Sequence, residues 1–371
     1  MARSKNKEAA VGSQNRTVSP NEAKSALTHC IKLQRPIMMW GAPGIGKSDI
    51  VKQIADTEGR EVIDIRLPLW EPTDIKGIPY YNSKENNMVW ASPAELPTDP
   101  KSNAIVFLDE LNSAAPAVQA AAYQLILNRR VGKYHLPDNV VMVAAGNRES
   151  DKGVTYRMPT PLANRFIHQE LRVNFESWEK WAVENKIHKD VVGYIASAKQ
   201  DLYDFDPKGA SRSFATPRSW TFVSEMLDDT TTDRSTLTNL IAGAIGEGLA
   251  VKFMAHRKIA SEMPNPTDIL EGKEKELKIK DISAMYSLVV SMCYELKERQ
   301  DKGMKEDAFN KNIDNFFEYM MANFETEIVV MGARTALTTY DLKFSPTKLK
   351  SFDRFHDKYG KYILKGSKNN D

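Results

Sequence analysis

Apolar and polar positions follow two different patterns along this chain, and the change falls near residue 174. Before it, short and nearly continuous apolar runs, typical of buried strands in a parallel sheet, alternate with segments of helical spacing. This alternation predicts an α/β fold with a doubly wound, parallel, five-stranded sheet. The expected strands are Ile37–Trp40, Val62–Leu67, Ile105–Leu108, Val140–Ala145 and Ile167–Val173.

From Phe175 onward, apolar positions recur at helical spacing only. Helices are expected over residues 176–184, 190–198, 220–227 and 237–254, as in a helical lid with a hinge near Asn174. Pro264, Pro266 and the charged run 271–276 indicate a linker. Three amphipathic helices are then expected over residues 282–298, 309–321 and 324–337.

These patterns divide the chain into four parts. Residues 1–20 form a polar, flexible leader, and a helix over Asn21–Leu33 follows it, capped by Ser19 or Asn21. The α/β core spans residues 21–174 and holds an insert at about 71–97. The helical lid spans residues 175–262, and the linker with a helical extension spans residues 263–371.

Composition is that of an ordinary globular protein, with 42% hydrophobic and 27% charged residues among 371. Cys30 and Cys293 each lie in an apolar helical pattern, so we expect buried free thiols rather than a disulfide or a metal site. The first 19 residues lack the apolar stretch of a signal peptide, and no run reaches membrane-spanning length. A cytoplasmic protein without membrane contact is therefore expected.

The segment after the first expected strand matches the phosphate-binding loop G-x-x-x-x-G-K-[ST] at every specified position. Glycine-rich backbone can bend its N–H groups toward an anion, and the helix that follows adds its positive end. Lys47 would then reach the β- and γ-phosphates, and the Ser48 hydroxyl would bind Mg²⁺. The expected nucleotide-binding residues are Gly41, Ala42, Pro43, Gly44, Ile45, Gly46, Lys47, Ser48 and Asp49.

Two further expected strands end in residues suited to hydrolysis. Asp109 and Glu110 close the strand that starts at Ile105, where Asp109 would hold Mg²⁺ and Glu110 would polarise the attacking water. Asn147 follows the strand that starts at Val140, and its amide is suited to contact the γ-phosphate and that water. The sequence therefore predicts a nucleotide-hydrolysing site.

The C-terminal residues from about 343 mix lysines and arginines with aromatic side chains, although the net charge of the whole chain is only +2. One interpretation is an amphipathic terminal helix packed by its aromatic residues, with its lysines in water. The other is a surface that follows a nucleic-acid backbone and stacks on bases. The first is the favoured interpretation, and nucleic acid stays a minor alternative.

The order of these motifs resembles that of AAA+ ATPases, and within them the MoxR branch, a helix-2-insert group of the dynein-related type. The resemblance covers roughly residues 21–258 and includes two later segments, Pro161–Phe166 and Thr216–Arg218. The segment Glu71–Pro79, followed by an expected hairpin through Asn86 and Asn87, is similar to the beginning of that branch's insert.

The resemblance implies roles that the patterns alone do not give. Arg165 matches the arginine finger that acts on the neighbouring subunit's site, with Arg157 and Arg148 as open alternatives, and Arg218 matches the sensor 2 arginine of the lid. It also implies Mg²⁺-dependent ATP hydrolysis in a homo-oligomer, a hexameric ring in this family. The expected task is to remodel or mature a partner protein complex, often with a separate von Willebrand A domain protein. A nucleic-acid-acting loader or helicase relative, and an assembly scaffold with little turnover, stay as alternatives.

Overall fold

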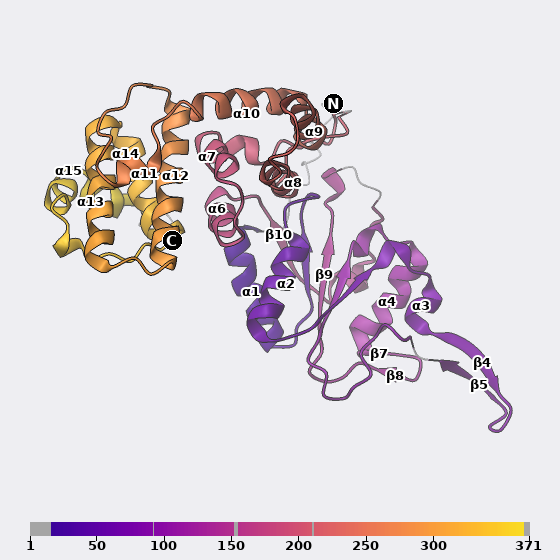
Figure 1. Ribbon diagram of the computed structural model, residues 1–371. Helices are drawn as coiled ribbons and strands as arrows, with labels where there is room; N and C mark the ends of the chain where they lie inside the picture. The colour runs from indigo at the N-terminus through magenta and orange to yellow at the C-terminus, as the bar shows by residue number, and fades with distance from the viewer. Residues whose placement is uncertain (1–15, 92, 152–154, 210, 367–371) are drawn as a thin grey trace, which may run out of the picture. The chain divides into compact units, whose positions relative to one another are not determined.

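The structure is a computed structural model that describes residues 16–91, 93–151, 155–209 and 211–366 (Figure 1). Most of the expected leader, residues 1–15, lies outside the described residues, as do the last residues of the basic tail. The chain divides into two compact units, residues 1–174 and residues 175–371, which we describe one at a time.

The N-terminal unit is built on a six-stranded sheet in which every neighbouring pair of strands is parallel, in the order β1-β10-β2-β9-β6-β3. The predicted α/β fold with a parallel sheet is confirmed. The strands are β1 (Thr17–Val18), β2 (Ile37–Trp40), β3 (Val62–Arg66), β6 (Ile105–Asp109), β9 (Val141–Gly146) and β10 (Ile167–Leu171).

The prediction of five strands was wrong by one, because β1 lies in the segment expected to be a flexible leader. Its two residues pair with Glu170 and Leu171 at the edge of the sheet. Two residues are too few to show a hydrophobic periodicity, so β1 can be recognised only by its pairing with β10 in the structure. The helix after it, α1 (Pro20–Lys32), is capped by Ser19, whose side chain accepts a hydrogen bond from the Glu22 N–H.

Helices cover both faces of this sheet (Figure 1). Alternate strand residues, such as Met38, Val106 and Met142, share one apolar cluster with Val118 and Leu125 of α4. The intervening residues face α2, which contacts β3, β6 and β9. The helices of this unit are α1, α2 (Lys47–Glu58), α3 (Pro72–Lys76), α4 (Pro116–Asn128) and α5 (Thr160–Ala163).

Strand β2, which precedes the phosphate-binding loop, lies between β9 and β10 in the sheet. From β2 the chain crosses to β3 at one edge, returns through β6 and β9, and then adds β10 on the other side of β2. The sheet therefore has a topological switch point at β2, and ligands of open α/β sheets bind beyond the carboxyl ends of strands at such a point.

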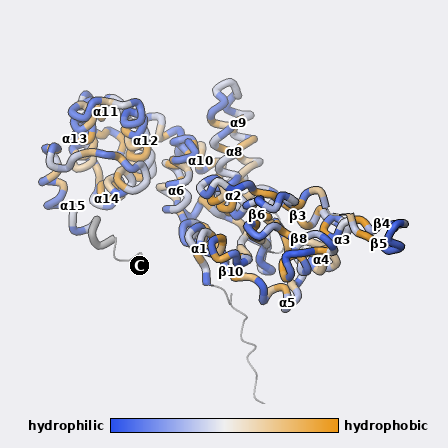
Figure 2. The backbone as a smooth tube through the Cα atoms, turned by 90° about the horizontal axis from the view of Figure 1, so that it is seen from below, coloured by the Kyte–Doolittle hydropathy of each residue, from blue (hydrophilic) through white to orange (hydrophobic). Residues whose placement is uncertain are grey.

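The chain between β3 and β6 forms a two-stranded antiparallel hairpin that projects away from the sheet, beyond α3 (Figures 1 and 2). It consists of β4 (Ile78–Asn82) and β5 (Asn87–Ala91), and Asn86 in its turn has a φ of 50°. Tyr80 and Tyr81 on β4 are 51% and 65% exposed, so the hairpin presents aromatic surface. A second, shorter hairpin joins β7 (Arg130–Val131) to β8 (Tyr134–His135).

The described part of the C-terminal unit contains helices and connecting segments. Its α-helices are α6 (Phe175–Glu184), α7 (Lys189–Ser197), α8 (Pro217–Asp228), α9 (Arg234–Ile245), α10 (Glu247–Ala260), α11 (Pro266–Leu270), α12 (Ile282–Asp301), α13 (Glu306–Asn323), α14 (Thr326–Arg334) and α15 (Phe352–Gly366). The single helix expected over residues 237–254 was wrong. Two helices stand there because Gly246 has a φ of 92°, which ends α9 and begins α10.

Within the described residues, helix α15 agrees with the favoured interpretation of the basic and aromatic tail at two aromatic positions, whereas Tyr362 is exposed. Phe355 and Tyr359 are buried, and the ring centroid of Phe355 lies 4.7 Å from that of Phe317 on α13. These rings belong to the apolar core of the unit, so they are not available to stack on bases. Cys293 is buried in the same core and Cys30 in α1, both as free thiols.

Candidate functional site

The phosphate-binding motif forms a tight loop between β2 and α2. Gly44 and Gly46 have φ values of 75° and 89°, a region that glycine adopts without steric cost. A Cβ on Gly41 would lie 2.5 Å from Ile45 Cδ1 and 3.3 Å from the Leu171 carbonyl oxygen, so the backbone packs closely there. Gly46 caps α2 without a side-chain hydrogen bond, which leaves the first N–H groups of the helix for an anion.

Lys47 lies within this loop and reaches a second motif. Its Nζ donates to the carbonyl oxygens of Gly41 at 2.7 Å and Ala42 at 2.9 Å, and to Asn147 Oδ1 at 3.1 Å. These three oxygens accept hydrogen bonds from the ammonium group, as phosphate oxygens of a bound nucleotide would. The fold thus brings together the predicted lysine and the predicted sensor amide, which are 100 residues apart in sequence.

Ser48 and Asp109 also meet at this edge of the sheet. Ser48 Oγ donates to Asp109 Oδ2 at 3.4 Å. A hydroxyl and one carboxylate suit Mg²⁺, which keeps several waters and takes further oxygens from substrate phosphates. Within the described residues no group of three or more His, Cys, Asp or Glu side chains could hold a metal ion by itself.

Glu110 follows Asp109 in an uncommon backbone conformation. Its φ is 55°, and its N–H donates to Asp109 Oδ1 at 2.9 Å. Left-handed backbone at a residue other than glycine costs energy and is often found at functional sites. Its carboxylate is exposed and makes no hydrogen bond or ion pair with the residues that the structure describes, so it is available to a water molecule.

The negative charge of Asp109 acts on a carboxyl group of the neighbouring strand. Burial raises the pKa of Asp64 on β3, and the negative charge of Asp109 raises it further. A cation bound at Asp109 would relieve that repulsion.

Asn112 is a residue of this site that sequence reasoning missed. Its Nδ2 donates to the Asn147 carbonyl oxygen at 2.8 Å, and its Oδ1 accepts from the Asn147 N–H at 3.2 Å. This reciprocal pair fixes the backbone that carries the Asn147 side chain. A Cβ on Gly146 would lie only 2.4 Å from Asn112 Oδ1, so glycine is required beside it. The available signal was a polar residue two positions after Glu110, at the start of an apolar stretch.

The three candidate arginines of this unit differ in their surroundings. Arg148 forms ion pairs with Asp151 at 2.9 Å and Glu170 at 3.2 Å, and its hydrogen bond to Asp151 is the main reason that its pKa is raised. Its guanidinium is therefore held within its own unit. Arg157 and Arg165 are exposed and form no ion pair among the described residues.

The sheet register places Arg165 away from the phosphate loop of its own chain. Ile167, two residues after it, pairs with Ile37, the first residue of β2, whereas the loop begins after the last. At the rise of a β-strand, the length of β2 alone is about 13 Å, more than an arginine side chain spans. Arg165 therefore lies toward the opposite, amino-terminal edge of the sheet.

His168 ties the turn that carries Arg165 to the strand before the phosphate loop. Trp40 Nε1 donates to His168 Nδ1 at 2.9 Å, and the two rings stack with centroids 5.9 Å apart. His168 Nε2 lies 2.8 Å from the Ala163 carbonyl oxygen, to which it donates when Nδ1 accepts. Both ring nitrogens are thus engaged between the end of β2 and α5.

Arg218 lies in the C-terminal unit, on the first turn of α8. Thr216 caps this helix by accepting from the Ser219 N–H at 3.1 Å, and Pro217 occupies its first position. Arg218 is exposed. Its assignment as a γ-phosphate contact stays a prediction.

Comparison with known proteins agrees with this site. Residues 36–168 match the family model described as "ATPase family associated with various cellular activities (AAA)". The matched range begins just before β2 and ends within β10, so it includes the phosphate loop, the acidic pair and Asn147. The α/β unit with its phosphate loop is therefore similar to the ATPase module of this family over residues 36–168.

One curated relative is midasin from Giardia intestinalis, with 27% identity over 187 residues. That alignment covers 48% of this chain and 4% of midasin, so the chain spans a small part of the length of this relative. The described residues contain no helix that is both long and apolar enough to span a membrane.

Among solved structures, the Thermotoga maritima RuvB Holliday junction branch migration motor matches with a TM-score of 0.36 and 19% identity, over 65% of this chain and 74% of that one. NtrX from Brucella abortus matches with a TM-score of 0.38 and 12% identity, over 80% and 68%. Because these scores and identities are low, they support no conclusion about function.

Proposed function

We propose that this protein is a MoxR-like AAA+ ATPase that hydrolyses ATP in a homo-oligomeric ring, a hexamer in this family, and uses the cycle to remodel or mature a partner protein complex. The observation that carries the proposal is the convergence of Lys47, Ser48, Asp109 and Asn147, joined by the hydrogen bonds given above. The exposed carboxylate of Glu110 stands next to that group.

Each side chain then has one task. The loop N–H groups and Lys47 bind the triphosphate, and Ser48 and Asp109 hold Mg²⁺, which when bound neutralises charge on the β- and γ-phosphates. Glu110 accepts a hydrogen bond from the attacking water and polarises it, while Asn147 orients that water and the γ-phosphate. Asn112 keeps Asn147 in place through its backbone.

The position of Arg165 supports the proposed oligomer. An exposed guanidinium without an ion pair among the described residues, on the far edge from its own loop, is suited to a neighbouring subunit's site. The arginine would stabilise charge on the transferring phosphoryl group, so a single subunit would turn over slowly. Arg218 on α8 would contact the γ-phosphate of its own subunit.

The exposed hairpin supports a protein partner. Ile78, Tyr80, Tyr81 and Met88 are each more than half exposed on its two strands, and apolar side chains on a projecting hairpin favour contact with another protein. A separate von Willebrand A domain protein is the partner type that the MoxR resemblance suggests. A nucleic-acid loader or helicase is less favoured, because Phe355 and Tyr359, two of the aromatic residues of α15 that it would use, are buried, while Tyr362 is exposed. A scaffold without turnover is disfavoured by the available Glu110.

The test combines two variants with complementary defects. Glu110→Gln should bind ATP and hydrolyse it very slowly, and Arg165→Ala should bind ATP normally yet lose at least about a thousandfold in turnover. Mixed rings should regain activity, because some interfaces then pair an intact Glu110 with an intact Arg165. Phosphate release measures turnover, and a fluorescent nucleotide measures binding, with Lys47→Ala as the variant that should fail to bind.

Arg157→Ala is the matched control, since Arg157 is the other exposed candidate. If Arg157→Ala, and not Arg165→Ala, shows the loss and the recovery on mixing, the finger is Arg157. If neither mixture recovers activity, or if monomers turn over at the full rate, the shared active site is wrong. Normal turnover of Glu110→Gln would overturn the role of Glu110.

A further inference from the structure

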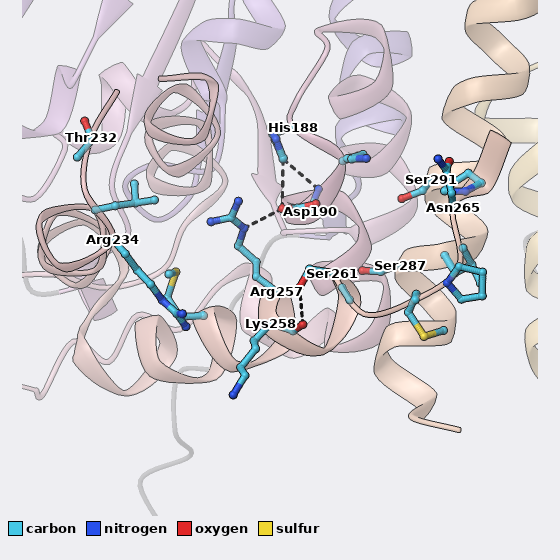
Figure 3. A pocket seen from close by; sticks show the side chains of 18 residues that line it. His188, Asp190, Thr232, Arg234, Arg257, Lys258, Ser261, Asn265, Ser287 and Ser291 are labelled. Carbon is cyan, nitrogen blue, oxygen red and sulfur yellow. Dashed lines mark hydrogen bonds and ion pairs between the residues drawn. The ribbon is translucent and has the colours of Figure 1, made fainter. Parts of the chain in front are cut away.

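A cavity of about 810 Å³ lies within the C-terminal unit, outside the matched ATPase range (Figure 3). Its walls are the start of α7, the loop into α9 with its first turn, the last turns of α10 with the loop that follows, and the middle of α12. A space of this size accommodates a ligand well beyond a single ion.

Positive side chains dominate this cavity. Asp190 is the single carboxylate among the residues that line it, against four cationic residues: Lys189, Arg234, Arg257 and Lys258. They come from α7, α9 and α10, and Figure 3 shows Arg234, Arg257 and Lys258 extending in different directions rather than toward one point. Charges spread in this way suit a ligand with several anionic groups.

An ion pair holds the Arg257 side chain in place and uses only some of its hydrogen-bond donors. Its Nε pairs with Asp190 Oδ2 at 2.7 Å, and the Asp190 N–H in turn donates to His188 Nδ1 at 3.1 Å. One carboxylate contact at Nε leaves the two amino groups of the guanidinium to bind another acceptor. Lys189, Arg234 and Lys258 are exposed and have no ion pair within the described residues.

The cavity also has an apolar part and a continuation. Leu237, Met254, Met263 and Leu288 line it beside the charged groups. A second cavity of about 630 Å³ shares residues of its lining, including Lys189, Asn265 and Ser291, so the two form one longer groove. We call these two cavities together the α7–α12 groove.

The shape and chemistry favour a peptide over other polyanions. No Phe, Tyr or Trp lines the cationic cavity in the part of the chain that the structure describes, so it offers no ring on which a base could stack. An extended peptide places acidic side chains against the cations and alternate apolar side chains against the aliphatic residues. The second cavity has mixed charge, since Asp228, Glu295 and Glu298 line it together with cationic residues, so we expect the acidic side chains of the peptide mainly in the first cavity.

We infer that the α7–α12 groove is a docking site for an acidic segment of a partner protein, in which Asp or Glu side chains bind Arg257, Arg234, Lys189 and Lys258 and an aliphatic residue packs between them. This inference goes beyond the proposed ATPase cycle, since it assigns a second protein-binding surface to the C-terminal unit. Docking of the acidic segment does not require ATP hydrolysis, so this inference and the ATPase proposal can be refuted separately.

The test measures binding of a fluorescein-labelled peptide of Asp-Glu-Leu repeats to the full-length chain by fluorescence anisotropy. The matched control peptide has Asn-Gln-Leu repeats. The acidic peptide should bind more tightly than the neutral one, and added KCl should weaken it. The double variant Arg234→Glu/Lys258→Glu should weaken it by at least about tenfold. Both side chains are exposed, so this change should leave the fold intact.

Lys252→Glu is the control variant, because it makes the same charge reversal as Lys258→Glu, at one exposed position of the same helix, α10, outside the groove. It should bind the acidic peptide as the unchanged protein does. Equal binding of the two peptides, equal weakening by Lys252→Glu, or no binding at all would overturn the inference. Preferential binding of a single-stranded oligonucleotide through Arg234 and Lys258 would also overturn it. If the unchanged protein bound the acidic peptide but hydrolysed no ATP, that result would count only against the ATPase proposal.

Discussion

Glu179 on α6 gives the prediction whose size follows most directly from the structure. This carboxyl group is 5% exposed, and its Oε2 accepts a hydrogen bond from Thr339 Oγ1 at 3.1 Å. Burial raises its pKa from 4.5 to about 7, against smaller lowering effects of Thr339 and Lys199. The proton is therefore bound more tightly in the folded unit than in the unfolded chain.

The sign of the effect follows from that direction. The stabilising contribution of the protonated group is complete below about pH 4.5 and is lost as the pH rises through about 7. A shift of that size corresponds to a loss of about 3 kcal/mol in the free energy of unfolding. Glu179→Gln keeps an oxygen acceptor for Thr339 and removes the ionisable group. We expect the free energy of unfolding of Glu179→Gln not to fall in this pH range, so that at pH 8 the variant is more stable than the unchanged protein.

Hydrogen exchange of peptides from α6 and α12 at several pH values measures this difference, because protection factors remove the intrinsic pH dependence of exchange. Glu184→Gln is the matched control, since Glu184 lies on the same helix and is exposed. It should retain the pH dependence of the unchanged protein. If Glu179→Gln showed that same dependence, the carboxyl group would not be buried in the protonated form and the reasoning would be refuted.

Two further predictions concern residues that hold the ATPase site. Asn112→Ala should reduce turnover by about tenfold or more with nearly unchanged nucleotide affinity, because Asn147 loses two hydrogen bonds worth about 1 kcal/mol each; unchanged steady-state phosphate release would contradict this. His168→Ala should lower kcat and leave KM nearly unchanged, since it releases the turn that carries Arg165. An increase in KM alone would place His168 in nucleotide binding instead.

Much of the N-terminal unit could be predicted from local sequence. The apolar runs of β2, β6 and β9 are nearly continuous because both faces of these strands are buried, and such runs stand out from helical spacing. Strand β1 could not be predicted, because two residues carry no period. The break between α9 and α10 at Gly246 was missed because an isolated glycine can be tolerated inside a helical pattern, so its presence alone does not mark a helix end.

By itself, the sequence determined the phosphate loop, the acidic pair at a strand end and the class of fold, because each depends on residues that are neighbours in the chain. Only the tertiary structure decided which distant groups meet: Asn147 at Lys47, Asn112 at Asn147, and Arg148 at Glu170. Periodicity reports which side of an element is buried. It does not report which strand lies beside which, and that order is set by pairing between segments far apart in the chain.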